Sequence, residues 1–141
     1  MVKKDIVTAK LGELADRIAQ IRLHRQTSAA DLAASRADRD LVSFNLMLSV
    51  QACADIAGHL IADEGWPVAT TLAESFARLH ERAVISPRSA MALASAVGLR
   101  NIVAHGYAGV DPQLLHVASV DGVVDLERYA SEISQWLLTQ P

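Results

Sequence analysis

The sequence predicts an all-α protein, a single-domain helical bundle of four to five helices, on three observations. Of the 141 residues, 51% are hydrophobic but only 4% are aromatic. The core must therefore be aliphatic and rich in alanine, which favours helices packed closely on helices. Apolar residues recur at intervals of three and four through most of the chain, as one face of a helix requires. Capping residues, glycine and proline stand where those patterns begin and stop. At this length we expect one domain covering residues 1–141.

The composition of the chain argues against several classes of protein. The net charge of −3 argues against a protein that coats nucleic acid by bulk charge, although a small cleft can still handle one phosphodiester. The single cysteine, Cys53, excludes an internal disulfide and fits a reducing compartment. The N-terminus lacks an apolar signal region, and acidic residues interrupt the longest apolar segment. We therefore expect a soluble, cytoplasmic protein that does not enter a membrane.

The first two helices are expected on either side of a polar break. An apolar stripe predicts the first helix over residues 3–24. Ser28 can cap a long second helix over residues 29–63. The front of that helix is polar and can be bent or frayed. Its back half, residues 41–61, is apolar around its circumference, which predicts a central position.

The remaining helices are marked by their caps. A capping-box pattern that begins at Thr71 predicts a short helix to about residue 83. Ser86 followed by proline predicts the start of a helix over residues 87–105, with Gly106 just beyond its end.

The segment over residues 106–124 reads as an irregular connection with room for one short helical turn. Asp121-Gly122 between valine-rich arms leaves a tight hairpin as the alternative. Asp125 is expected to cap the last helix.

Four polar residues gather at the end of the helix predicted over residues 87–105. They are Arg100, Asn101, His105 and Tyr107. Asn101 and His105 are four residues apart and lie nearly above one another on a helix, whereas Arg100 is roughly 140° round from His105. Arg100 and His105 of one chain therefore diverge, and a second copy of the helix would bring the two residue types together more easily.

Arg100, His105 and Tyr107 form an Arg-x4-His-x-Tyr pattern that resembles the signature of the HEPN superfamily of small helical ribonucleases. Within that superfamily, the chain is most similar to the HepT-like toxins. The similarity continues over residues 51–62 and into the final helix. The resemblance implies a homodimer in which two such motifs face one another. It further implies a type VII-like toxin–antitoxin pair whose other member is an MntA-like nucleotidyltransferase antitoxin.

These residue types fit the cleavage of RNA without a metal. The RNA 2′-hydroxyl attacks the adjacent phosphate if a base removes its proton and an acid protonates the leaving 5′-oxygen, and histidine suits both tasks. A guanidinium stabilises the charge that develops on the phosphoryl oxygens. We therefore expect His105 and Arg100 to be catalytic, with tRNA or mRNA as substrate. No metal-binding or phosphate-loop motif is present in the sequence, so we expect no metal and no cofactor.

Three other residues are candidates for supporting or RNA-binding roles: Asn101, Asp55 and His59. Asn101 either orients the His105 ring, holds RNA, or bonds to the backbone at the helix end. Asp55 and His59 belong with Gln51 to a polar stripe at intervals of four on an apolar helix. That stripe either lines the cleft or forms a satisfied structural network or a dimer contact.

Tyr107 has a second role that only the resemblance implies. In HepT-like toxins the matching tyrosine is where the antitoxin attaches AMP, so Tyr107 is the expected site of AMPylation. The alternative is that Tyr107 packs under the following loop or contacts RNA. The functional hypothesis is thus a metal-independent endoribonuclease toxin silenced by its partner. Its rival is a non-catalytic HEPN binding module that docks a nucleotidyltransferase or binds a nucleotide.

Overall fold

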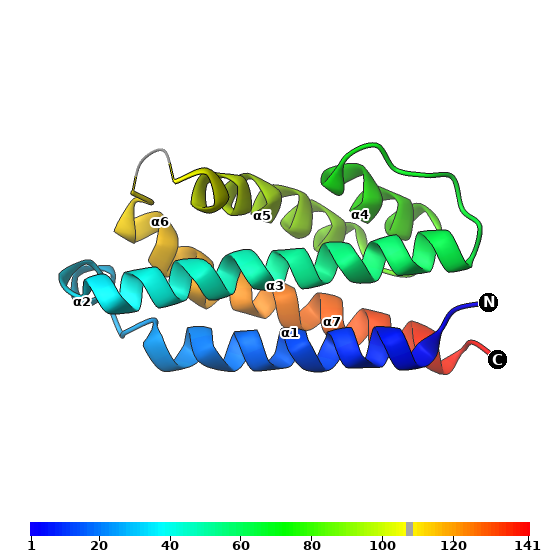
Figure 1. The fold of residues 1–141 in the computed structure, drawn as a ribbon, viewed down its shortest axis with the longest axis horizontal. Coiled ribbons are helices and arrows are strands. Elements are labelled where there is room, and N and C mark those ends of the chain that lie inside the picture. Colours follow the sequence, from blue (N-terminus) through cyan, green and yellow to red (C-terminus); the bar gives the residue numbers. More distant parts are fainter. Residues whose placement is uncertain (107–108) are drawn as a thin grey trace.

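A computed structural model describes residues 1–106 and 109–141 of the chain (Figure 1). Within those residues every regular element is helical, which confirms the predicted all-α class. The elements are, in order, α1 (Lys4–His24), α2 (Ala29–Ala34), α3 (Arg36–Asp63), α4 (Leu72–Glu81), α5 (Pro87–His105), α6 (Pro112–Val117), the π-helical segment η1 (Ala118–Gly122) and α7 (Val123–Leu138).

The long helix α3 runs through the middle of the bundle, with α1 along one side of it and α4 and α5 along the other (Figure 1). Helix α7 packs against α1, α3 and α5 and so closes the bundle. Both termini lie at the same end of the molecule (Figure 1). There Lys4 Nζ donates a hydrogen bond to the backbone oxygen of Gln140 at 2.6 Å, which joins the first helix to the end of the chain.

The caps predicted from sequence hold the helix starts. The hydroxyls of Ser28, Thr71 and Ser86 each accept a hydrogen bond from the backbone N–H three residues later. The capping box at α4 differs in one detail. The Glu74 carboxylate accepts from the backbone and hydroxyl of Thr70, one residue further back than the usual partner. The predicted extents of α1 and α5 agree with the structure to within one residue.

The single helix predicted over residues 29–63 is wrong at Ser35. Ser35 is extended (φ −115°, ψ 104°), and it ends α2 and caps α3 through its hydroxyl. The break is secured from outside the helix, because the carboxylate of Asp38 is held by Gln26 and His24. The polar front half that the sequence suggested to be bent is therefore a separate six-residue helix followed by a new helix start.

The connection expected after residue 106 is more regular than predicted. Asp111 caps α6, and the chain then continues through η1 into α7 without an extended residue. Gly122 is in the right-handed helical region (φ −62°, ψ −35°), so no hairpin forms at Asp121-Gly122. Asp125 does not cap α7. It lies within the first turn and accepts a hydrogen bond from Arg128.

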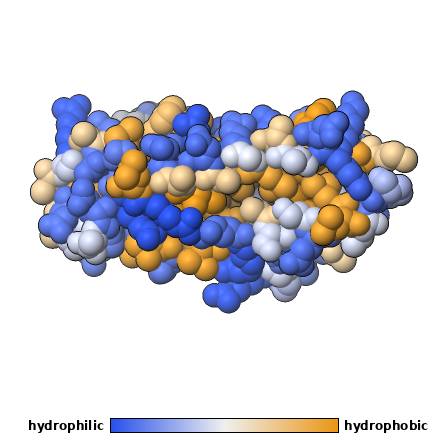
Figure 2. Space-filling view, turned by 90° about the horizontal axis from the view of Figure 1, so that it is seen from below, coloured by the Kyte–Doolittle hydropathy of each residue, from blue (hydrophilic) through white to orange (hydrophobic). Residues whose placement is uncertain are grey.

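The core is aliphatic, as the composition required, and α3 supplies the largest share of it. Tyr129 of α7 is the largest fully buried side chain, and its ring meets Phe76 of α4 edge to face at 5.8 Å. Among the described residues, α3 alone is long and apolar enough to span a membrane, but more than half of its most apolar stretch is buried inside the bundle. On the face seen from below in Figure 1, hydrophilic atoms cover much of the surface and hydrophobic atoms show between them (Figure 2).

Candidate functional site

Arg100 lies on α5, one and a half turns before its end, and is half-buried against α3. Its Nη2 donates a hydrogen bond to Gln51 Oε1 of α3 at 2.8 Å, and its Nη1 donates to Asn101 Oδ1 at 3.0 Å. Its Nε is buried and has no acceptor among the described residues. The guanidinium is therefore directed along the surface of α3 and keeps donors available for an anion.

His105 is the last residue of α5 and is exposed. Gly106 ends the helix there in the left-handed conformation (φ 62°), with its N–H bonded to Ile102 O at 3.1 Å. Glycine adopts this conformation without the steric cost that a side chain would add. The helix end thus presents the imidazole to solvent, where a substrate can approach it.

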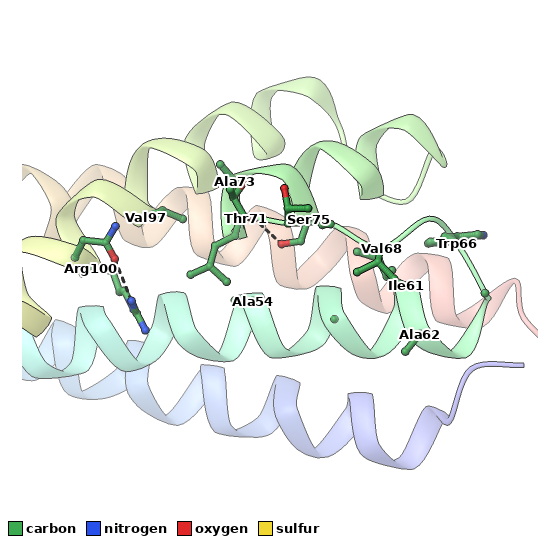
Figure 3. Close-up of a pocket in the computed structure, with 16 residues that line it drawn as sticks. Ala54, Ile61, Ala62, Trp66, Val68, Thr71, Ala73, Ser75, Val97 and Arg100 are labelled. Atoms are coloured by element: carbon green, nitrogen blue, oxygen red, sulfur yellow. Dashed lines mark hydrogen bonds between the residues drawn. The ribbon is translucent and has the colours of Figure 1, made fainter.

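A groove of about 830 Å³ starts at Arg100 and Asn101 and runs between α3 and α4. Figure 3 shows Arg100 at one end of this groove and Trp66 at the other. Small residues of α3 form much of the floor of the groove, among them Ala54, Gly58 and Ala62. His105 is not among the described residues that line it. Both residues lie on the same helix, α5, so the spacing of five positions still predicts that their side chains leave the helix in different directions.

A second cavity, of about 240 Å³, lies on the other side of Arg100. It is lined by residues of α3, α5, α6, η1 and the start of α7, and its walls are mostly apolar. The carboxylates of Asp121 and Asp125 stand among the residues that line it. Arg100 therefore separates two hollows of different character, one open and long, the other small and apolar.

The predicted polar stripe on α3 divides into two parts. Gln51 contacts Arg100 directly, and Gln51 Nε2 donates to Asp55 Oδ1 at 3.1 Å, so Asp55 reaches the motif through Gln51. His59 lines a shallow hollow with Asp55 and Lys10, and none of the hydrogen bonds described here joins it to Arg100. The supporting role of Asp55 is thus compatible with the geometry, whereas that of His59 stays a prediction without a contact to the motif.

Lys10 is a member of this cluster that the sequence analysis missed. Its Nζ lies 3.5 Å from Asp55 Oδ2. Lys10 belongs to α1, far from the motif along the chain. No sequence pattern relates it to Asp55, because their contact depends on how α1 packs against α3. Tyr107 lies outside the described residues, so its expected role is neither supported nor opposed by the geometry.

Cys53 is excluded as a nucleophile. It is fully buried on α3, and burial raises the pKa of its thiol well above the usual range, so the reactive thiolate does not form. The acid–base and anion-binding groups exposed near the end of α5 are instead imidazole, guanidinium and carboxamide. These groups can move protons and bind phosphate.

Comparison with known proteins identifies the family of this chain. The family model described as ribonuclease HepT-like matches residues 13–133. The tRNA nuclease HepT of Aphanizomenon flos-aquae (strain 2012/KM1/D3) is 29% identical over 94 residues, which cover 67% of this chain. The match spans 64% of that relative's own length.

Solved structures share the fold over nearly the whole chain. A toxin–antitoxin complex with AMP-PNP has a TM-score of 0.86 at 23% identity, covering 93% of this chain and 98% of that one. The tri-AMPylated Shewanella oneidensis HEPN toxin in complex with MNT antitoxin has a TM-score of 0.85 at 24% identity and the same coverage. The cytosolic protein YutE of Bacillus subtilis has a TM-score of 0.83 at 15% identity, covering 98% of this chain and 92% of that one. With the family model matching most of its length, the chain belongs to the HepT-like ribonuclease family.

Proposed function

We propose that this protein is a metal-independent endoribonuclease toxin that cleaves tRNA or mRNA. The observation that carries the proposal is the pairing, on one helix, of a half-buried guanidinium that keeps donors available and an exposed imidazole at the helix end. Arg100 lines a groove of about 830 Å³ between α3 and α4, where we propose that the RNA lies. The relative named a tRNA nuclease supports the same class of substrate.

The proposed reaction uses the RNA as its own nucleophile. The 2′-oxygen forms a bond to phosphorus while its proton passes to the imidazole of His105. The bond from phosphorus to the 5′-oxygen then breaks, and the imidazole of a second His105 donates a proton to that oxygen. Arg100 stabilises the negative charge on the phosphoryl oxygens, and the product carries a 2′,3′-cyclic phosphate.

A second copy of the chain supplies the second histidine. On α5 only Ser89 and Leu93 are buried, although the helix is rich in apolar residues. Met91 is 73% exposed and Ile102 45% exposed on the same helix. A helix that is apolar yet so little covered favours burial against another chain. We therefore infer an isologous homodimer with the two α5 helices near its axis.

The inhibitor of the toxin is proposed to be an MntA-like nucleotidyltransferase that AMPylates Tyr107. Two of the solved structures similar to this fold are toxin–antitoxin complexes, and one of those toxins is AMPylated. In the sequence Tyr107 directly follows the glycine that ends α5 and is two residues after His105. The attached phosphate would repel the RNA phosphate that the site has to receive. The cytoplasm is the compartment consistent with such a toxin and with its single thiol.

The rival function is a binding module that does not cut RNA. The test is to incubate the purified protein with end-labelled tRNA and mRNA in EDTA. Fragments that end in a 2′,3′-cyclic phosphate support the proposal, and their formation in EDTA supports metal independence. Intact RNA at protein concentrations far above those of the RNA would overturn the proposal in favour of the binding module.

A further inference from the structure

Four polar side chains form a continuous chain of contacts from α1 across α3 to α5. Lys10 Nζ lies 3.5 Å from Asp55 Oδ2, Gln51 Nε2 donates to Asp55 Oδ1 at 3.1 Å, and Arg100 Nη2 donates to Gln51 Oε1 at 2.8 Å. Gln51 and Arg100 are 49 positions apart in sequence. The chain of contacts therefore exists only because three helices pack together.

The Asp55 carboxylate fixes which way the Gln51 amide points. An ionised carboxylate only accepts hydrogen bonds, so it holds the amide NH₂ end of Gln51. The amide oxygen then faces Arg100, which only donates. Rotating the amide by half a turn would set an oxygen against the carboxylate and an NH₂ against the guanidinium, and both contacts would be repulsive. Lys10 Nζ adds a positive charge on the far side of Asp55 and contacts that carboxylate from α1.

A neutral acceptor at position 51 suits a guanidinium that has to bind phosphate. The Gln51 oxygen holds Arg100 by a hydrogen bond without cancelling its charge. A carboxylate in the same place would form an ion pair and compete with an incoming phosphate for the same donors. Gln51 and Asn101 occupy one N–H group on each Nη atom of the guanidinium, which leaves the second N–H group on each of them for a ligand, while Nε is buried without an acceptor among the described residues.

We propose that Gln51 is a positioning residue for Arg100 and that the Asp55–Lys10 pair orients Gln51. This inference rests on the proposed function, since it concerns how Arg100 meets the phosphoryl group of RNA. Binding of the ground-state phosphate tolerates small errors in the direction of the guanidinium. Stabilisation of the transition state does not, because a displacement of about 1 Å at a reacting group can cost up to ~10²-fold in rate.

Loss of Gln51 should therefore lower kcat while changing KM little. Gln51→Met keeps the length of the side chain and removes both of its hydrogen bonds, the one with Arg100 and the one with Asp55. We expect it to lower kcat by at least ~10-fold, with KM close to that of the unchanged protein. Lys10→Met should give a smaller loss in the same direction, because it acts two contacts away. Lys4→Met is the matched control, since it removes a contact of α1 at the far end, to Gln140, and should leave kcat unchanged.

A double-mutant cycle separates positioning from a general effect on folding. Single-turnover cleavage with protein in excess measures the residual rate of Arg100→Ala with and without Gln51→Met, and circular dichroism confirms that each variant is folded. A positioning role predicts that Gln51→Met has no further effect once Arg100 is absent. If Gln51→Met lowered the cleavage rate by the same factor with Arg100 present and with Arg100→Ala, the positioning role would be overturned. An Arg100→Ala chain as active as the unchanged protein would instead overturn the proposed function.

Discussion

Tyr129 of α7 donates a hydrogen bond from its phenol to the backbone oxygen of Cys53 on α3, at 2.8 Å and in the fully buried core. The two residues are 76 positions apart, so this bond ties the last helix to the central one. Burial raises the pKa of the Tyr129 phenol well above its ordinary value, and so the phenol stays protonated and can donate this bond at neutral pH.

Tyr129→Phe should destabilise the protein without disturbing its function. The substitution keeps the ring that packs on Phe76 and removes only the hydroxyl. We expect a loss of about 0.5–1.5 kcal/mol in the free energy of unfolding, the usual net contribution of one hydrogen bond. Urea unfolding at a fixed chain concentration measures it. No change in the midpoint would mean that the phenol contributes only packing.

His105→Ala and Arg100→Ala should each lower RNA cleavage by ~10²–10⁴-fold while leaving helicity intact. His105 is exposed at the end of α5 and Arg100 is half-buried near it, and neither belongs to the buried apolar core. Arg88→Ala, an exposed arginine in the first turn of the same helix, and His80→Ala, an exposed histidine on α4, are the controls. Cleavage retained by either motif variant would remove that residue from the mechanism.

The protein should sediment as a dimer, and Met91→Glu should shift it toward monomer. A charge at this exposed apolar position of α5 would have to be buried in the proposed interface, which is costly without a partner. Cleavage should fall as the dimer is lost, because each chain supplies only one His105 and the proposed reaction needs two. Leu23→Glu, at a comparably exposed position on α1, should leave both properties unchanged. Full activity from a strictly monomeric protein contradicts the two-histidine mechanism.

Tyr107→Phe should remain an active ribonuclease and escape silencing. The phenylalanine lacks the oxygen that would carry AMP, so a co-expressed nucleotidyltransferase with ATP should leave it active. Intact-mass measurement of the unchanged protein should show added AMP that the variant lacks. Silencing of the variant to the same extent as the unchanged protein, or an unmodified Tyr107 in that protein, would exclude this role.

Asp38 should make the break between α2 and α3 sensitive to acid. Hydrogen bonds from Gln26 and then from His24 hold the pKa of the Asp38 carboxyl below its ordinary value of 3.8. A lowered pKa in the folded state stabilises the protein above about pH 4, and that contribution is lost as the pH falls through the folded value.

Asp38→Asn should therefore reduce the stability of the protein at pH 7. It should also make the stability decrease less steeply as the pH is lowered below about 4. Thermal melts across this range give the comparison. Asp40→Asn is the control, since it removes only an exposed ion pair with Arg36 at 3.7 Å, which contributes little. Parallel pH profiles for Asp38→Asn and the unchanged protein would show that the Asp38 contacts do not stabilise the fold.

Signals that act within a few residues were sufficient to predict much of this protein. The caps at Ser28, Thr71 and Ser86 and the glycine stop at Gly106 depend on hydrogen bonds between residues no more than four apart, so the sequence shows them directly. The same holds for the all-α class and for the divergence of Arg100 and His105, which follows from helical periodicity.

Packing between distant segments decided what the sequence did not predict. The break at Ser35 is held by Asp38 together with Gln26 and His24, which come from before α2. The π-helical turn at residues 118–122 replaces the expected loop, and there Arg25, the residue that follows α1, donates a hydrogen bond to Ser119 O. The contact of Gln51 with Arg100, and of Lys10 with Asp55, likewise joins residues of different helices. Residue types and helical periodicity alone predict which residues are candidates for the chemistry and at which end of the helix they lie. What holds Arg100 in place is visible only in the packed fold, because a hydrogen bond between helices depends on the rotation and distance of both and leaves no periodic mark in either.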